Sequence, residues 1–282
     1  MSTEIELWEA VLLGIVEGLT EFLPISSTGH LTFVEKLLGY EIDDQDVTAF
    51  TAIIQIGAVL ATALYFRRDL KRIIVAVVAG LRDHERRSTV DFRFGVAVAL
   101  GSLPIGFAGL LFQDQIETTL RSLWFVGVAL LLWSGVMWVA DRAATQVRGE
   151  ADVTRRDTLI IGLVQCLALI PGVSRSGATM SAGLLRGLDR VTVTRLSFFL
   201  SIPALSAACV LQAVTEYSNI SDGVGWTATI TATVVSFVVA YFAVAWLLRF
   251  IAGHTYAVFI GYRVVLGTVI LALVASGTIS ST

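Results

Sequence analysis

Long runs of apolar residues recur along the chain, and six of them have roughly the length that a membrane-crossing helix needs. A helix rises about 1.5 Å per residue, so about 20 apolar residues cross the hydrocarbon core of a bilayer. The pattern therefore predicts membrane-spanning helices at residues 47–66, 94–112, 123–140, 196–214, 227–248 and 256–275.

Two further pairs of apolar stretches are too short to cross, and a polar turn separates the two members of each pair. These stretches are residues 7–23 and 30–39 in the first pair, and residues 159–170 and 178–188 in the second. Pro24 lies in the first turn and Pro171 in the second, and proline ends helices. We therefore expect two re-entrant helical hairpins, each of which returns to the side from which it entered.

The composition agrees with a membrane protein. Of the 282 residues, 55% are hydrophobic and 15% are charged, and the mean hydropathy is +0.78. These values exclude an ordinary soluble domain. The net charge of −3 gives no reason to expect nucleic acid as a partner. We predict one all-α, polytopic membrane domain over residues 1–282, with membrane lipids around it and an oligomeric state that the sequence leaves open.

Basic residues are distributed unevenly between the two predicted faces of the membrane. Sixteen of the twenty Lys and Arg residues fall in loops on one face, whereas only Lys36 and Arg121 fall on the other. Loops rich in Lys and Arg stay in the cytoplasm. We therefore predict a multi-pass protein of the plasma membrane, with both termini and the active site toward the outside.

A weak internal repeat relates the two polar turns. Moving the chain by 148 residues places Ser26 on Ser174 and Gly29 on Gly177. Each half contains one hairpin and three crossings, an odd number, so the halves must be inverted relative to each other, and their hairpins should meet near the midplane. The predicted inverted repeats are residues 1–140 and 157–282.

Two carboxylates, Glu17 and Glu21, lie four residues apart in the first hairpin. On a helix this spacing puts them on one face. They could simply face water near the outer end of the helix. In a poorly solvated site, however, two carboxylates repel, which either raises the pKa of one of them or recruits a divalent cation. We predict Glu17 and Glu21 as metal ligands, with Mg²⁺ or Ca²⁺ as the ion.

Three hydroxyl residues and an imidazole follow in the first turn, because Ser26, Ser27 and Thr28 precede His30. Such hydroxyls can cap a helix, and a lone histidine often has a structural role. An imidazole near hydroxyls is also the arrangement that activates a nucleophile or moves a proton. We predict Ser27 and His30 as catalytic residues, and Ser26 and Thr28 as substrate-binding residues. The spacing leaves open whether Ser26, Ser27 or water attacks.

Arg175 in the second turn is a permanently charged side chain inside an apolar hairpin. Its planar fork suits phosphate oxygens, and the neighbouring glycines let a ligand approach the backbone. The alternative is an ion pair with Glu17 or Glu21. We predict Arg175 as catalytic, together with Glu21, and assign Arg263 in the last span to packing or to the membrane interface. The predicted substrate-binding residues in the second turn are Ser174, Ser176 and Thr179.

The segments EGLTEFLPISSTGHL (residues 17–31) and PGVSRSGATMSAG (residues 171–183) resemble the two signature motifs of the undecaprenyl pyrophosphate phosphatase family, the bacitracin-resistance integral membrane type. The resemblance extends over essentially the whole chain. It implies hydrolysis of a polyprenyl diphosphate to the monophosphate at the outer face of the membrane, which recycles the lipid carrier for cell-envelope glycan synthesis, and dependence on a divalent cation. The residues that match the family's functional positions are Glu17, Glu21, Ser26, Ser27, His30, Ser174, Arg175 and Thr179.

The hypothesis for the mechanism is an in-line attack on the terminal phosphorus. Arg175, the backbone N–H groups of the turns and a cation on Glu17 and Glu21 would neutralise the phosphate oxygens, and His30 would move the proton. Inverted repeats with broken helices also occur in secondary transporters. A transporter or flippase for a prenyl phosphate or another anion is therefore the alternative function.

Overall fold

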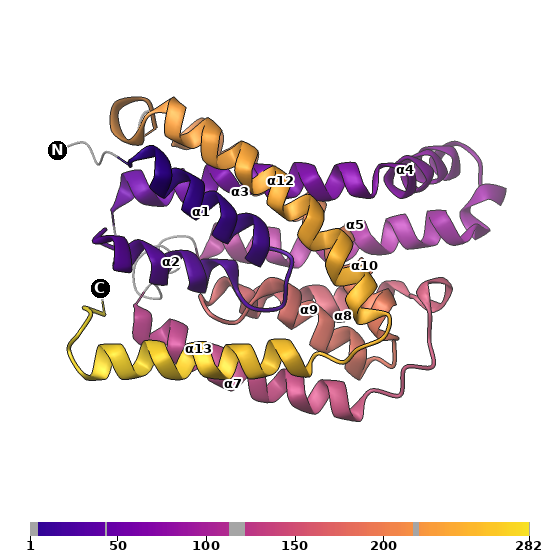
Figure 1. The fold of residues 1–282 in the computed structure, drawn as a ribbon. Coiled ribbons are helices and arrows are strands. Elements are labelled where there is room, and N and C mark those ends of the chain that lie inside the picture. The colour runs from indigo at the N-terminus through magenta and orange to yellow at the C-terminus, as the bar shows by residue number, and fades with distance from the viewer. Residues whose placement is uncertain (1–4, 43, 113–121, 217–219, 282) are drawn as a thin grey trace.

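Six long helices dominate the structure, a computed structural model that describes residues 5–42, 44–112, 122–216 and 220–281 (Figure 1). Each of the six is long and apolar enough to cross a membrane, which confirms the six predicted spans. Arg121, which the sequence placed on the outer face, lies outside the described residues. The six helices are α3 (Gln45–Tyr65), α5 (Val90–Leu111), α7 (Leu123–Ala143), α10 (Arg190–Thr215), α12 (Trp226–Ile251) and α13 (Ala257–Ala275).

Two of these helices begin earlier than the apolar runs predicted, because polar caps extend them. The hydroxyl of Thr89 accepts a hydrogen bond from the backbone N–H of Phe92 at the start of α5. The carboxylate of Asp189 accepts one from the N–H of Thr192 at the start of α10. Such N-caps satisfy the free donors of the first turn. Hydrophobicity alone therefore predicts the apolar part of these helices but not their ends.

Shorter helices occupy the two regions where the sequence predicted hairpins. They are α1 (Leu7–Thr20), α2 (Ser27–Leu38), α8 (Arg155–Gln165) with the 3-10 turn η4 (Cys166–Leu169), and α9 (Arg175–Leu185). The turns that separate them contain Pro24 and Pro171, as predicted. Their re-entrant insertion in a bilayer stays a prediction. The remaining connections are α4 (Arg67–Arg82) and the turns η1 (Glu85–Ser88), η3 (Glu150–Asp152) and η5 (Ile220–Val224).

The same close packing occurs twice, once for each short-helix pair. Helix α1 packs along α12, and α8 packs along α5. Gly14 of α1 lies against the backbone of Ala232, and Gly162 of α8 lies against the backbone of Gly101. Because glycine has no Cβ, each pair of helices can bring its backbones into contact. Gly14 and Gly162 are equivalent under the shift of 148 residues. The repeat boundaries themselves remain a prediction.

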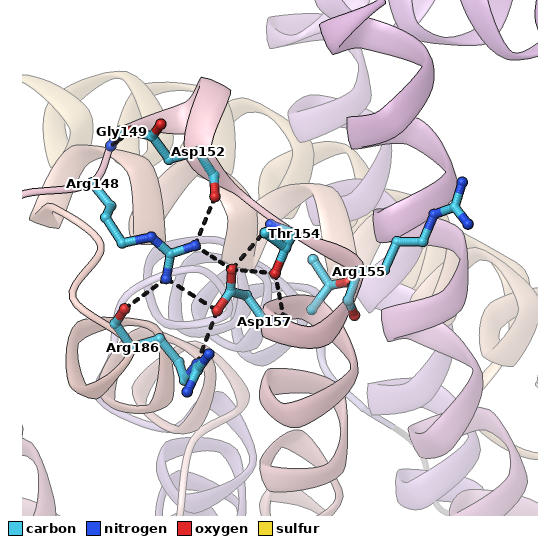
Figure 2. A network of polar contacts seen from close by, with 8 residues as sticks. Arg148, Gly149, Asp152, Thr154, Arg155, Asp157 and Arg186 are labelled. Carbon is cyan, nitrogen blue, oxygen red and sulfur yellow. Dashed lines mark hydrogen bonds and ion pairs between the residues drawn. The ribbon is translucent and has the colours of Figure 1, made fainter. Parts of the chain in front are cut away.

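A buried carboxylate fixes the start of α8 (Figure 2). Asp157 is fully buried, and Figure 2 shows it surrounded by Arg148, Thr154 and Arg186. It accepts hydrogen bonds from both arginines and from the backbone and hydroxyl of Thr154. Burial alone would raise the pKa of Asp157, but these donors hold it well below the usual range. The contact ties the loop before α8 to the end of α9.

We expect Gly162→Ala to lower the thermal stability of the protein. A Cβ at this position would lie 2.0 Å from the carbonyl oxygen of Gly101, so α5 and α8 would have to separate, at a cost of about 1–3 kcal/mol. Thermal unfolding in detergent measures the effect. Gly135→Ala on α7 is the matched control, because a Cβ there meets nothing within 4 Å. Equal melting temperatures for the two variants would contradict the close packing.

We expect Asp157→Asn to lower the free energy of unfolding by about 3 kcal/mol at neutral pH, because the change leaves two partly buried arginines without their counter-charge. The folded-state pKa of Asp157 lies below its unfolded value. Its contribution is therefore complete at neutral pH and is lost only as the pH falls below the ordinary aspartate range toward the folded pKa. Melting temperatures of both proteins across pH measure this. Equal melting temperatures of the wild-type protein and Asp157→Asn at neutral pH would refute the role of this carboxylate.

Candidate active site

The two turns share one backbone geometry. Ser26 and Ser174 each have a positive φ, of 76° and 75°, and each serine is the N-cap of the helix that follows. The hydroxyl of Ser26 accepts a hydrogen bond from the N–H of Gly29 at 3.3 Å, and that of Ser174 accepts one from Gly177 at 3.1 Å. A positive φ at a residue other than glycine costs about 1–3 kcal/mol and persists only where the surroundings enforce it.

Hydrogen bonds join the two turns directly. The backbone N–H of Gly172 donates to the hydroxyl of Ser26 at 3.2 Å. In the opposite direction, the hydroxyl of Ser176 donates to the carbonyl of Leu23 at 2.8 Å. Segments about 150 residues apart in sequence thus form one structural unit, as the predicted meeting of the hairpins requires.

Arg263 of α13 also holds both turns. Its fully buried guanidinium donates to the carbonyl of Gly172 at 2.8 Å and to the carbonyl of Pro24 at 3.4 Å. A third hydrogen bond goes to the hydroxyl of Ser134 at 3.2 Å. The sequence predicted only a packing or interfacial role for Arg263. An arginine inside a predicted span was the signal for a larger role, because such a charge is costly in a membrane unless it has partners.

A cavity of about 140 Å³ lies where the turns meet. Its polar lining comes from both turns, namely Glu21, Ser26, Ser27 and Thr28 from the first and Ser174 and Arg175 from the second. The rest of the lining is Gln55 of α3, Ile105 of α5, Ala168, Leu169, Pro171 and Leu205 of α10. The sequence did not single out Gln55, Ile105 or Leu205, because the pattern of one span does not show which of its faces meets another segment.

One carboxylate occupies the centre of this site. The hydroxyl of Ser27 donates to Oε2 of Glu21 at 2.5 Å, and Nη2 of Arg175 donates to Oε1 of the same residue at 2.8 Å. The ion pair with Glu21 that the sequence offered as an alternative role for Arg175 is therefore present. The guanidinium also lies over the ring of Phe22, 5.4 Å from its centre. The geometry brings together a hydroxyl, a base and a cation.

Two buried polar atoms near this centre have no hydrogen-bond partner among the described residues. They are Nη1 of Arg175 and Oε1 of Glu17. Glu17 is almost fully buried and interacts electrostatically with both Glu21 and Arg175. Buried polar groups that stay unpaired are costly. A ligand with anionic oxygens would satisfy Arg175, and a cation would satisfy Glu17.

The carboxylates fit one common mode of cation binding. The described residues contain no cluster of three or more His, Cys, Asp or Glu side chains of the kind that encloses a metal ion. Mg²⁺, however, is usually held by one or two carboxylates together with the phosphates of a substrate. Glu21 lines the cavity and Glu17 does not, but Glu17 has an unpaired oxygen and interacts electrostatically with Glu21, so the two carboxylates fit this mode.

Two helices begin at the cavity. Helix α2 starts at Ser27 and α9 starts at Arg175, and both residues line the cavity. The first N–H groups of a helix have no acceptor within that helix, and they attract anions. The site therefore combines a guanidinium with two helix N-termini, which suits a phosphate group.

His30 does not line the cavity. The ring lies in the turn with its Nδ1 2.7 Å from the carbonyl oxygen of Ser26 and its Nε2 2.7 Å from the hydroxyl of Tyr262 on α13. Both nitrogens thus already have partners within the protein. The sequence grouped His30 with the hydroxyls before it, because spacing does not show in which direction a ring points.

Two other predicted residues contact protein groups and do not line the cavity. The hydroxyl of Ser176 points to Leu23, as described above. The hydroxyl of Thr179 contacts the carbonyl of Arg175 at 2.9 Å and the hydroxyl of Ser197 at 2.7 Å. Both therefore support the turn and the first turn of α9, while Ser26, Thr28 and Ser174 reach the cavity wall.

A second cavity, of about 340 Å³, lies near the start of α10 and the connection between α12 and α13. Its arginine, Arg190, already donates to Asp141 at 2.7 Å and to Gln146 at 3.2 Å. The charge in this cavity is therefore compensated, and the cavity at the two turns is the better candidate for chemistry.

Comparison with known proteins gives a consistent result. The chain matches the family described as "Bacitracin resistance protein BacA" over residues 10–269. It is 70% identical to "Undecaprenyl-diphosphatase 3" of Frankia casuarinae, over 97% of this chain and 99% of that protein. It is 53% identical to "Undecaprenyl-diphosphatase" of Cutibacterium acnes, over 96% and 98%, and 47% identical to "Undecaprenyl-diphosphatase 1" of Streptomyces coelicolor, over 98% and 99%.

Proposed function

The chain belongs to the bacitracin resistance protein BacA family, and we propose that Ser27, Glu21 and Arg175 carry out its reaction. The protein is a membrane undecaprenyl-diphosphatase, which hydrolyses undecaprenyl diphosphate to the monophosphate and inorganic phosphate and so recycles the lipid carrier. One observation supports the residue assignment above all: Ser27 and Arg175 contact opposite oxygens of Glu21 at the cavity.

In the first step, the hydroxyl oxygen of Ser27 attacks the terminal phosphorus. Glu21 accepts the hydroxyl proton, which it already receives as a hydrogen bond. A bond forms between Ser27 and phosphorus, the bond from phosphorus to the bridging oxygen breaks, and undecaprenyl phosphate leaves with the bonding electron pair. The phosphoryl group remains on Ser27.

In the second step, water attacks the phosphorus of phosphorylated Ser27. Glu21, which has passed its first proton to solvent, accepts a proton from this water. The bond between phosphorus and the Ser27 oxygen breaks, Glu21 passes the proton from the water to that oxygen, and inorganic phosphate is released. We assign the attack to Ser27 and not to Ser26, because the hydroxyl of Ser26 already accepts hydrogen bonds from Gly29 and Gly172.

Arg175 stabilises the charge on the phosphoryl oxygens. Its Nη2 stays on Glu21, while the unpaired Nη1 is free to donate to the substrate. The N–H groups at the starts of α2 and α9 add further donors. Charge stabilisation of this kind is the main contribution of a protein to phosphoryl transfer. Ser26, Thr28 and Ser174 bind the substrate at the cavity wall, whereas Ser176 and Thr179 act indirectly by shaping the second turn.

A divalent cation, Mg²⁺ or Ca²⁺, is part of the proposal, with Glu17 and Glu21 as its protein ligands. When bound, the ion would supply positive charge to the diphosphate. The unpaired oxygen of Glu17 supports this assignment.

The arrangement of the bundle supports the proposed orientation. The start of α1 and the end of α13 lie at one end of the bundle, whereas α4, with the basic residues Arg67, Arg68 and Lys71, lies at the other (Figure 1). We infer that the end with α4 is cytoplasmic and that the cavity opens toward the opposite, outer side. On this proposal the two short-helix pairs are re-entrant hairpins that belong to repeats at residues 1–140 and 157–282.

We expect the purified protein in detergent to release phosphate from undecaprenyl diphosphate. Ser27→Ala and Glu21→Gln should lower kcat by at least about 100-fold, because each removes a group that takes part in bond formation. Arg175→Lys should have a similar effect, since lysine lacks the planar fork. Ser181→Ala is the control: this buried hydroxyl on α9 donates to the carbonyl of Gly177 and does not line the cavity.

A colorimetric phosphate assay measures these rates, and acid-stable phosphoserine analysis detects the covalent intermediate. Near-normal turnover of Ser27→Ala would show that Ser26 or water attacks in place of Ser27. Absence of phosphate release by the wild-type protein, combined with transport of a prenyl phosphate in vesicles, would support the transporter alternative.

Removal of divalent cations should abolish phosphate release, and added Mg²⁺ or Ca²⁺ should restore it. Glu17→Gln should raise the cation concentration needed for half-maximal activity by about tenfold or more, because it removes one of two charged ligands. Titration of the metal at saturating substrate measures this shift. Full activity in the presence of a strong chelator would disprove the cation assignment without affecting the assignment of Ser27.

A further inference from the structure

The ring of His30 is held between a carbonyl and a hydroxyl. A carbonyl oxygen only accepts hydrogen bonds, so the contact with Ser26 requires Nδ1 of His30 to carry a proton. In a neutral imidazole Nε2 is then the acceptor, and the hydroxyl of Tyr262 donates to it. The two contacts therefore fix both the orientation of the ring and its tautomer. The charged and titratable neighbours of the ring are Tyr262 and Arg263, both on α13.

This position gives the ring no route for a proton from the reaction. The partner of Nδ1 is an amide carbonyl, which cannot take up a proton and pass it on. The partner of Nε2 is Tyr262, whose side chain is 45% exposed on the outer surface of the helices. Neither His30 nor Tyr262 lines the cavity. The hydroxyl of Ser27 already has an acceptor in Glu21.

The ring of His30 instead holds Ser26, the strained residue immediately before the proposed nucleophile Ser27. The carbonyl of Ser26 accepts hydrogen bonds from the His30 ring at 2.7 Å and from the His30 N–H at 3.2 Å. Ser26 has a positive φ, and Ser27 follows it directly. The direction of the Ser26 carbonyl determines the direction of the next peptide, and so the position of the Ser27 hydroxyl relative to Glu21.

The second turn shows the same strain with a different support. The shift of 148 residues places Ala178 at the position of His30, so no ring contacts the carbonyl of Ser174. There the hydroxyls of Ser174 and Ser176 lie 3.2 Å apart, and the residue after Ser174 is the long, adaptable Arg175. The short side chain of Ser27 must be positioned more precisely by its backbone than the long side chain of Arg175.

We propose that His30 is a positioning residue, which acts through the carbonyl of Ser26 to keep the hydroxyl of Ser27 on Glu21, and that Tyr262 holds the ring for this purpose. The proton of the reaction then passes to Glu21 and not to His30. This inference rests on the proposed roles of Ser27 and Glu21.

The test compares His30→Asn with His30→Gln and His30→Ala in the phosphatase assay. The amide nitrogen of asparagine lies close to the place of Nδ1 and can still donate to Ser26, whereas glutamine reaches the place of Nε2. We expect His30→Ala and His30→Gln to lose about 100-fold in kcat, as a displaced reacting group does. His30→Asn should stay within about tenfold of wild type, and KM should change little in all three.

The pH profile separates positioning from proton transfer. His30→Asn should keep the wild-type pH profile of kcat, since on this proposal the imidazole takes no part in proton transfer. Tyr262→Phe should lower kcat moderately with the same profile. Glu21→Gln is the reference for loss of the base. The inference is wrong if His30→Asn is as inactive as His30→Ala. It is also wrong if the pH profile of His30→Asn or of Tyr262→Phe differs in shape from that of the wild-type protein.

Two controls keep the result decisive. Gel filtration in detergent shows which His30 variants fold, and if none does, the profile of Tyr262→Phe decides alone. An inactive wild-type protein would overturn the proposed function itself, whereas an active wild type with an inactive His30→Asn overturns only the positioning role.

Discussion

Glu21 accepts hydrogen bonds from both halves of the protein, and the site depends on this shared carboxylate. Ser27 donates to one of its oxygens and Arg175 to the other, so neither turn can move without unbalancing a buried charge. Arg263 reinforces the contact by donating to one carbonyl of each turn. The backbone strain at Ser26 and Ser174 is tolerated because these bonds together determine the conformation.

The two turns have the same backbone but different chemistry. Under the shift of 148 residues, Ser27 corresponds to Arg175, so that equivalent positions carry a hydroxyl and a guanidinium. Glu17 corresponds to Gln165, which is also fully buried and whose amide atoms have no hydrogen-bond partner in the described part of the chain. A symmetric scaffold thus holds an asymmetric site, in which acid and base character come from the first turn and positive charge from the second.

The sequence predicts best those features of the fold that depend on a single physical effect. The six spans follow from hydrophobic length alone, and the turns follow from Pro24 and Pro171 in apolar surroundings. The sequence does not predict in which direction each side chain points. Thr179 and His30 carry suitable chemistry, but their hydrogen bonds lead to Ser197 and Tyr262, residues on other helices. Only tertiary structure reveals such partners. The same holds for Arg263, whose acceptors in the two turns are backbone carbonyls that no sequence pattern marks.

The position of Gln55 in α3 shows how far the cavity lies from the ends of this helix. Gln55 lines the cavity and stands at the middle of a helix that runs from Gln45 to Tyr65, so about 15 Å of helix separates it from either end. The diphosphate of a lipid normally rests among the headgroups, well above that level. On the proposed function, the diphosphate must therefore leave the headgroup level and enter the protein to about the middle of α3 before it can react.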